Sequence, residues 1–471
     1  MGFIDGSVVS LAMPAIRSDL GATLVDAQWI GNGYMLFLSS LVLLGGAAGD
    51  VFGVRYIFAG GIAFFMAASL ACALAPDAET LILMRALQGV GAAFMVPGSL
   101  ALVAKAYPPE TRGRAIGQWA AFSSLTTAGG PFVGGMMLSF GAEWMWRLVF
   151  AINVPIGMVA LAMLMLKVPK DNPPEKRRLD VFGAVLATLG LGLMAWGLTS
   201  FGEAPAQRVV SPWFWLLGGA AIFWLFIVWE RRVAMPMVKL ELFRSRAFSG
   251  ANLYTLILFF AFNAVLFFLP MTVVTGWGAS EWQASLLVVP LSLVIAAFSG
   301  KAGQIADRIG PRLLLTLGAV LVGLSYAGLA FTMPLMLIWE VTFPILLLQA
   351  VGMAMLVSPL STAVMQATPQ ADTGLASGIN NAVARTSGLM AVAALGAVAS
   401  LVFAAVMGGV SGVEFGARPE QVLPADIEAL RVAATNRAFQ LIAAISAVIC
   451  FLAAAISWST QPSWSKDGAG Y

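Results

Sequence analysis

The chain carries one ten-residue pattern twice, as GAAGDVFGVR at residues 46–55 and as GQIADRIGPR at residues 303–312. The shared positions are Gly46, Asp50, Gly53 and Arg55 in the first copy and Gly303, Asp307, Gly310 and Arg312 in the second. Glycine permits a tight turn, and an acid between two helix ends can meet an arginine or a helix N-terminus. One copy alone would also fit a short charged turn, but two copies 257 positions apart indicate a repeat.

A second set of residues repeats at nearly the same distance, 261 positions. It pairs Gln88, Gly91, Pro108, Gly113 and Gly117 with Gln349, Gly352, Pro369, Gly374 and Gly378. Internal symmetry of this kind predicts two duplicated halves.

The composition is that of a membrane protein. Hydrophobic residues make up 60% of the 471 residues and charged residues only 10%, against roughly 45–50% and about 25% in soluble domains. A net charge of +3 without a long basic run argues against a nucleic-acid partner. The chain has no histidine, so we expect no metal site and no cofactor, and any proton chemistry must use carboxylates. Cys72 and Cys450 lie in apolar segments and predict buried thiols.

A bilayer core of about 30 Å needs about 20 apolar residues per helix. Runs of this kind predict an all-α polytopic membrane protein with fourteen spans, at 1–16, 28–50, 54–75, 79–105, 112–140, 147–167, 181–200, 213–230, 248–275, 282–305, 311–332, 339–366, 373–408 and 436–459. The distance of 257 residues between the two copies corresponds to about eight spans. Two adjoining halves of six spans would place the copies only six spans apart, so two extra spans lie between the halves. The predicted parts are an N-terminal six-helix bundle at 1–167, linkers with an inserted helix pair at 168–247, a C-terminal six-helix bundle at 248–459 and a tail at 460–471.

Charge placement predicts the orientation. Most of the 26 lysine and arginine residues fall in one set of loops, which the positive-inside rule assigns to the cytoplasm. Both termini are then cytoplasmic, and we expect the protein in the inner membrane of a bacterium. The first predicted helix would be only about 24 Å long. It is shorter than the bilayer core, so we expect the natural chain to begin upstream of Met1.

The repeated loop resembles the signature loop of the major facilitator superfamily, which acts there as a cytoplasmic latch between two bundles. The first copy departs from the usual pattern, because Val51 stands where a basic residue is common. The resemblance covers nearly the whole chain. It implies the major facilitator fold, with two pseudo-symmetric six-helix bundles and two inserted helices, as in drug:proton antiporters of the fourteen-helix type.

The fourth predicted helix contains Arg85 and Gln88 in the stretch RALQGVGAA. A charged arginine inside a span costs about 2.5 to 3.5 kcal/mol on insertion scales, so it needs a partner or a wet cavity. The alternative is an arginine that snorkels to the outer surface. The stretch is similar to the helix 4 motif of proton-coupled members of the superfamily, in which the arginine is linked to proton transfer.

The fifth predicted helix contains Gly130, Pro131, Gly134 and Gly135. Proline removes a backbone hydrogen bond, and small residues let a neighbouring helix approach closely. This segment resembles the antiporter motif of the superfamily. A generic packing kink is the alternative.

The first predicted helix carries Asp5 within FIDGSVVSLAMP, residues 3–14, which is close to the acidic helix 1 motif of the same subfamily. Asp5 lies about 18 Å from Arg17 along a helix, and therefore near the midplane. An unpaired carboxylate there is costly as an anion, so we expect it to bind and release a proton. A structural hydrogen bond is the alternative. Leu346 occupies the repeat position of Arg85, which assigns proton coupling to the first half.

The substrate site is expected near the midplane, between the two bundles. Each polar or aromatic candidate could instead form a hydrogen bond between helices. The candidates are Asn32, Tyr34, Gln88, Trp119, Asn252, Asn263, Gln349, Asn380, Asn381 and Arg385.

These features predict a monomeric antiporter in the lipid bilayer, not an enzyme, that uses protons to export hydrophobic or amphipathic compounds. Dedicated export of one endogenous metabolite, such as an antibiotic or a siderophore, is the alternative. A receptor or assembly partner would need neither an intramembrane acid nor a repeated loop. A lipid-modifying enzyme would need clustered His, Asp or Glu at a membrane face.

Overall fold

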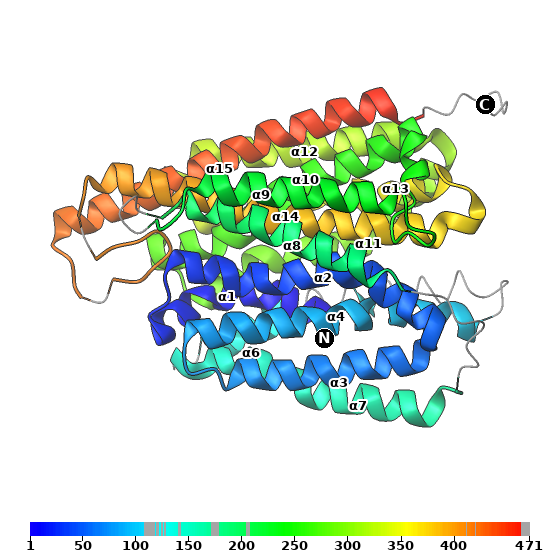
Figure 1. Ribbon diagram of the computed structural model, residues 1–471. Coiled ribbons are helices and arrows are strands. Elements are labelled where there is room, and N and C mark those ends of the chain that lie inside the picture. Colours follow the sequence, from blue (N-terminus) through cyan, green and yellow to red (C-terminus); the bar gives the residue numbers. More distant parts are fainter. Residues whose placement is uncertain are drawn as a thin grey trace.

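The computed structural model of the chain is shown in Figure 1. The structure describes residues 1–107, 118, 122–123, 126, 129–139, 143–170, 179–203, 208–410, 412–419 and 421–462. These residues form helices joined by turns and loops, and no strand occurs among them. The helices run side by side in roughly one direction (Figure 1).

Twelve helical segments in the described part are long and apolar enough to cross a membrane. Their helices are α2 (Leu24–Phe52), α3 (Val54–Ala73), α4 (Ala78–Ala106), α6 (Trp146–Ala151) with α7 (Asn153–Lys167), α8 (Val181–Ser200), α9 (Pro212–Glu230), α10 (Arg246–Met271), α11 (Glu281–Ile309), α12 (Pro311–Thr332), α13 (Phe343–Gln366), α14 (Thr373–Met407) and α15 (Ala425–Thr460). At the first and fifth expected positions lie α1 (Gly2–Leu20) and a helical stretch at 129–138. The all-α membrane fold is confirmed, and the count of fourteen spans stays a prediction.

Helix ends differ most from the prediction where charged residues extend a helix beyond its apolar run. α15 begins at Ala425, well before the predicted start at residue 436. Its first turns carry Asp426, Glu428 and Arg431, and a search for apolar runs stops at such residues. α1 likewise continues past residue 16 to Leu20.

The two copies of the ten-residue pattern join equivalent helices. Gly53 separates α2 from α3 with a φ of 95°, and Gly310 separates α11 from α12 with a φ of 84°. Side chains other than that of glycine rarely tolerate this conformation. The packing repeats as well, because α2 and α3 pack against α4 while α11 and α12 pack against α13. The duplication inferred from the sequence is therefore present in the structure.

The helix pair α8 and α9 packs beside the line where the two halves meet. The two helices contact each other, and α8 also contacts α2 and α14. Thr188 in α8 donates a hydrogen bond to Ser40 Oγ in α2 at 2.8 Å. Ser400 in α14 donates to the carbonyl of Gly202, just after α8, at 2.8 Å. One helix of the pair thus bridges both halves.

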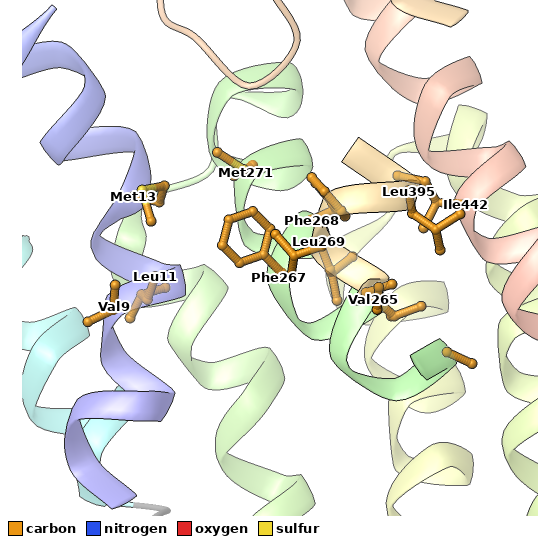
Figure 2. Packing of buried hydrophobic residues seen from close by; sticks show 14 of the residues in the cluster. Val9, Leu11, Met13, Val265, Phe267, Phe268, Leu269, Met271, Leu395 and Ile442 are labelled. Carbon is orange, nitrogen blue, oxygen red and sulfur yellow. The ribbon is translucent and has the colours of Figure 1, made fainter. Parts of the chain in front are cut away.

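Apolar contacts join the halves along α1 and α10. Figure 2 shows side chains of α1, among them Leu11 and Met13, near Phe267 and Met271 of α10. They belong to one buried cluster that continues into α14 and α15. The functional groups described next lie along this interface.

Candidate functional site

An ion pair joins α1 to α4 in the interior. Arg85 Nη1 lies 2.6 Å from Asp5 Oδ2, and the two side chains are 2% and 0% exposed. Arg85 Nε donates to the carbonyl of Ile30 in α2 at 3.0 Å. Three helices therefore hold one guanidinium, and their hydrogen bonds offset part of the cost of desolvating the pair.

Gln88, one turn after Arg85 on α4, extends the ion pair into a network. Its Oε1 accepts from Arg85 Nη1 at 2.5 Å, and its Nε2 donates to Asp5 Oδ1 at 3.0 Å. The same nitrogen donates to Ser69 Oγ of α3 at 3.1 Å. Asn153 Nδ2 of α7 donates to that hydroxyl at 3.0 Å. The carboxylate of Asp5 is thus fixed by a chain of partners from three other helices.

Two aromatic rings enclose the guanidinium. Arg85 Cζ lies 4.3 Å from the centroid of the Tyr34 ring and 5.5 Å from that of Phe150. A guanidinium is planar and weakly hydrated, so it stacks well on aromatic faces. An ammonium group is strongly hydrated and has no flat face to stack. The site is therefore built for arginine in particular.

The network bears on the expectations for four residues. Asp5 is not unpaired, because the packing of α4 near α1 brings Arg85 to it. Arg85 has the buried partner that the cost of its charge led us to expect, and the alternative, an arginine that snorkels to the surface, is wrong. Gln88 and Tyr34, which were expected to face the substrate, hold the ion pair in this structure, and a place for them in the substrate site stays a prediction. Ser69 was missed, because nothing in its sequence neighbourhood shows which helix α3 meets.

The glycines of the fifth helix permit two close approaches. A Cβ on Gly134 would lie 2.3 Å from Cγ1 of Val8 in α1, one turn after Asp5. A Cβ on Gly135 would lie 2.5 Å from Cβ of Ser285 in α11, which belongs to the other half. Gly130 and Pro131 are buried one turn earlier. This segment therefore touches both the helix of the acid and the opposite bundle.

A cavity of about 60 Å³ lies where the halves meet. Its wall comes from α1, α2 and α4 of the first half and from α10 and α14 of the second. Its polar groups include Asn32, Asn263 and Arg85. Pockets for drug-sized ligands measure roughly 300 to 1,000 Å³. The cavity is thus contracted, and the halves must separate to admit a large compound.

Several other substrate candidates form hydrogen bonds between helices, the alternative that the sequence left open. Asn380 of α14 donates to Asn252 Oδ1 at 3.2 Å and to Thr255 Oγ1 at 2.7 Å, both in α10. Gln349 of α13 donates to the hydroxyl of Tyr326 in α12 at 3.1 Å. These three candidates therefore tie the second half together.

The last three candidates differ in their surroundings. Asn381 is exposed and donates to the carbonyl of Ser377 in its own helix. Trp119 lies outside the described residues. Arg385 lies in the interior part of α14, and its Nε atom is enclosed without a hydrogen-bond partner.

The arginines of the repeated loop have equivalent contacts. Arg55 Nη2 donates to the carbonyl of Met165 at 2.8 Å, near the end of α7. Arg312 Cζ lies 3.9 Å from the centroid of the Trp458 ring, near the end of α15. Each arginine reaches the last helix of its own half. The acids of the two loops, Asp50 and Asp307, are exposed. A latch between the bundles stays a prediction.

A loop that the sequence did not single out closes one end of the interface. The described residues between α14 and α15, at 408–410, 412–419 and 421–424, extend from one end of the bundle (Figure 1, orange). Glu414 Oε2 lies 2.8 Å from Arg17 Nη2 of α1, and the carbonyl of Phe415 accepts from Arg17 Nη1 at 2.6 Å. Phe415 itself is 1% exposed. The sequence showed Arg17 only as a charged flank, because a loop's partner cannot be read from its composition.

Apolar helices arranged as two related halves, with a charged network and a cavity where they meet, define the architecture of a membrane transporter. The family model of the Major Facilitator Superfamily matches residues 1–393. The chain belongs to this superfamily and is a multi-pass membrane protein of the transporter class.

Three relatives carry names of resistance or export proteins. The methylenomycin A resistance protein of Streptomyces coelicolor is 31% identical over 448 residues, which cover 89% of this chain and 91% of the relative. The tetracenomycin C resistance and export protein of Streptomyces glaucescens is 30% identical, with 83% and 72% covered. The multidrug resistance protein Stp of Mycobacterium tuberculosis (strain CDC 1551) is also 30% identical, with 84% and 73% covered.

The similarity to solved structures bears on the fold and not on the function. A bacterial homologue of the human lysosomal transporter Spinster, in an inward-facing and occupied conformation, superposes with a TM-score of 0.68 at 17% identity. The match covers 97% of this chain and 93% of that chain.

Proposed function

We propose that this chain is a proton-coupled antiporter that exports hydrophobic or amphipathic compounds across the inner membrane of a bacterium. The names of its relatives support export of drugs or antibiotics. One observation carries the proposal of proton coupling. Arg85 pairs with Asp5 and also lines the cavity between the halves, so it connects the acid to the place where a substrate would lie.

The coupling follows from the charge of this pair. With Asp5 ionised, the pair has no net charge. A proton on Asp5 removes its charge and leaves Arg85 as an uncompensated cation in the cavity wall. Substrate and proton then each change the affinity for the other, and exchange requires that each lowers it.

The proposed architecture has fourteen spans, with α1 and the helix around residues 129–138 included and both termini in the cytoplasm. The loop that binds Arg17 then lies outside the cell. In this orientation the loop keeps the outer end of the interface closed. Release of α1 from this loop would open the path by which a proton reaches Asp5.

Transport by proteoliposomes tests the proposal. Purified protein is reconstituted, a proton gradient is imposed, and accumulation of tetracenomycin C, methylenomycin A and ethidium is measured. Asp5→Asn should lower gradient-driven accumulation by about tenfold or more, because the proton carrier is lost. Asp426→Asn, which changes an exposed acid at the start of α15, serves as the control and should transport normally. Full gradient-driven accumulation by Asp5→Asn would remove Asp5 from the mechanism.

Dedicated export of one metabolite is the second candidate, because one relative is named for resistance to and export of a single compound, tetracenomycin C. The same assay separates the two. Transport of all three chemically different compounds supports multidrug export, whereas transport of one class alone supports a dedicated exporter.

A further inference from the structure

Arg385 is a half-buried cation without a partner among the described residues. Its guanidinium forms no hydrogen bond or ion pair with any residue that the structure describes, and its Nε atom is fully enclosed. Three buried arginines in the described part have carboxylate partners: Arg85 binds Asp5, Arg17 binds Glu414, and Arg431 binds Glu428. A fourth, Arg55, donates to the carbonyl of Met165. A charge inside a membrane protein is costly unless it is paired. An anion beside Arg385 would offset the cost of its enclosed charge, and the described residues supply none.

The position of Arg385 points to the cavity between the halves. Gly388, one turn later on α14, lines this cavity. Arg385 therefore lies about one helical turn from the cavity wall, near the place where a substrate would bind.

A second unsatisfied donor lies in the cavity wall. Asn32 of α2 is 1% exposed, and its side-chain nitrogen has no hydrogen-bond acceptor. The neighbouring polar group of the wall, Asn263, donates to the carbonyl of Phe259 in its own helix at 2.7 Å. A ligand that carries an acceptor oxygen would satisfy Asn32, as it would Arg385.

We propose that Arg385 and Asn32 bind an anionic oxygen, a carboxylate or a phenolate, of the exported compound. This inference rests on the proposed function and specifies its substrate class. Asp5, Arg85 and Arg385 together carry one excess positive charge beside the cavity, which an anion would neutralise. Leu266, Phe267 and Val392 supply apolar wall for the rest of the molecule. An organic anion with a flat apolar body matches this combination of charge and surface.

Equilibrium binding without a proton gradient tests the assignment separately from transport. The probes are 3-hydroxy-2-naphthoate, its neutral methyl ester and the cation 1-naphthylmethylammonium, with binding followed by quenching of the protein's tryptophan fluorescence. The wild-type protein should bind the naphthoate about 10- to 100-fold more tightly than the ester, as hydrogen bonds between ionised groups imply. Arg385→Gln should lose this preference and still bind the ester. Arg385→Lys should retain part of the preference for the naphthoate. Asn32→Leu should lower the affinity for both the naphthoate and the ester. Arg246→Gln, at the exposed start of α10, is the control.

Two results would overturn the proposal. One is a wild-type protein that shows no preference for the naphthoate, including one that does not bind it. The other is an unchanged ratio of naphthoate to ester affinity in Arg385→Gln and Arg385→Lys. Either result leaves proton coupling through Asp5 untouched, because that is measured by gradient-driven transport.

Discussion

At the scale of single residues, the sequence identifies an acid and a base inside the membrane spans but does not show that they form a pair. Asp5 and Arg85 were both predicted from the cost of a charge inside a span. Their contact, and the support from Ser69 and Asn153, depends on how α1, α3, α4 and α7 rotate against one another. Sequence spacing shows which residues share a face of one helix, but not which helix that face meets.

The several hydrogen bonds of the Arg85 guanidinium lead to a prediction about its replacement by lysine. Arg85→Lys keeps the charge but offers one point donor where the arginine reaches Asp5, Gln88 and the carbonyl of Ile30 together. We expect at least about a tenfold loss of gradient-driven transport, with thermal unfolding in detergent nearly unchanged. Transport at the wild-type rate would show that only the charge matters.

The contact between Gly134 and Val8 gives a second prediction. Gly134→Ala places a methyl group where Val8 Cγ1 now lies, and overpacking of this kind costs about 1 to 3 kcal/mol. The midpoint of thermal unfolding should fall. Val8→Ala removes the opposing methyl group, so the double variant should recover most of the loss. If the two single effects simply add, the helices do not touch at this point.

At the scale of elements, the apolar runs predicted every described span, while contacts outside the bilayer were missed. α15 starts early because Asp426, Glu428 and Arg431 continue the helix into polar surroundings. No sequence pattern singled out the loop between α14 and α15. Its contact with Arg17 joins residues almost 400 positions apart, which no local pattern encodes.

That loop is expected to keep one end of the interface closed. Glu414→Ala removes the carboxylate shared by Arg17 and the backbone nitrogen of Leu24. A cysteine at Ser10, in a variant whose two natural cysteines are replaced by serine, should then react several-fold faster with a polar maleimide. Glu428→Ala breaks a pair within α15 and should leave the rate unchanged. Equal rates in both variants would show that the loop does not control access.

At the scale of the whole molecule, the duplication predicted from the repeated loops holds, but the two halves have diverged in chemistry. Gln88 belongs to the charge network, while its repeat partner Gln349 binds the hydroxyl of Tyr326. Leu346 replaces the arginine and is buried among apolar side chains. The described second half therefore contributes part of the cavity wall and Arg385, while the acid lies in the first half.

This asymmetry sets the energetics of the proposed exchange. One proton that enters across 100 mV supplies about 2.3 kcal/mol, enough for roughly a fiftyfold gradient of a neutral compound. An anion that leaves in the same cycle moves a second charge in the favourable direction. The membrane potential therefore drives export of anions more strongly than export of neutral compounds.

The central claim is that a proton on Asp5 and a substrate in the cavity are linked through Arg85. Proton release tests it most directly, as the pH change of a weakly buffered solution of detergent-purified protein when a transported compound is added. The wild-type protein should release protons in proportion to bound compound, because exchange requires that substrate lowers the affinity for the proton. Asp5→Asn should bind the compound with no proton release. An Asp5→Asn variant that exchanges as many protons as the wild type would contradict the account.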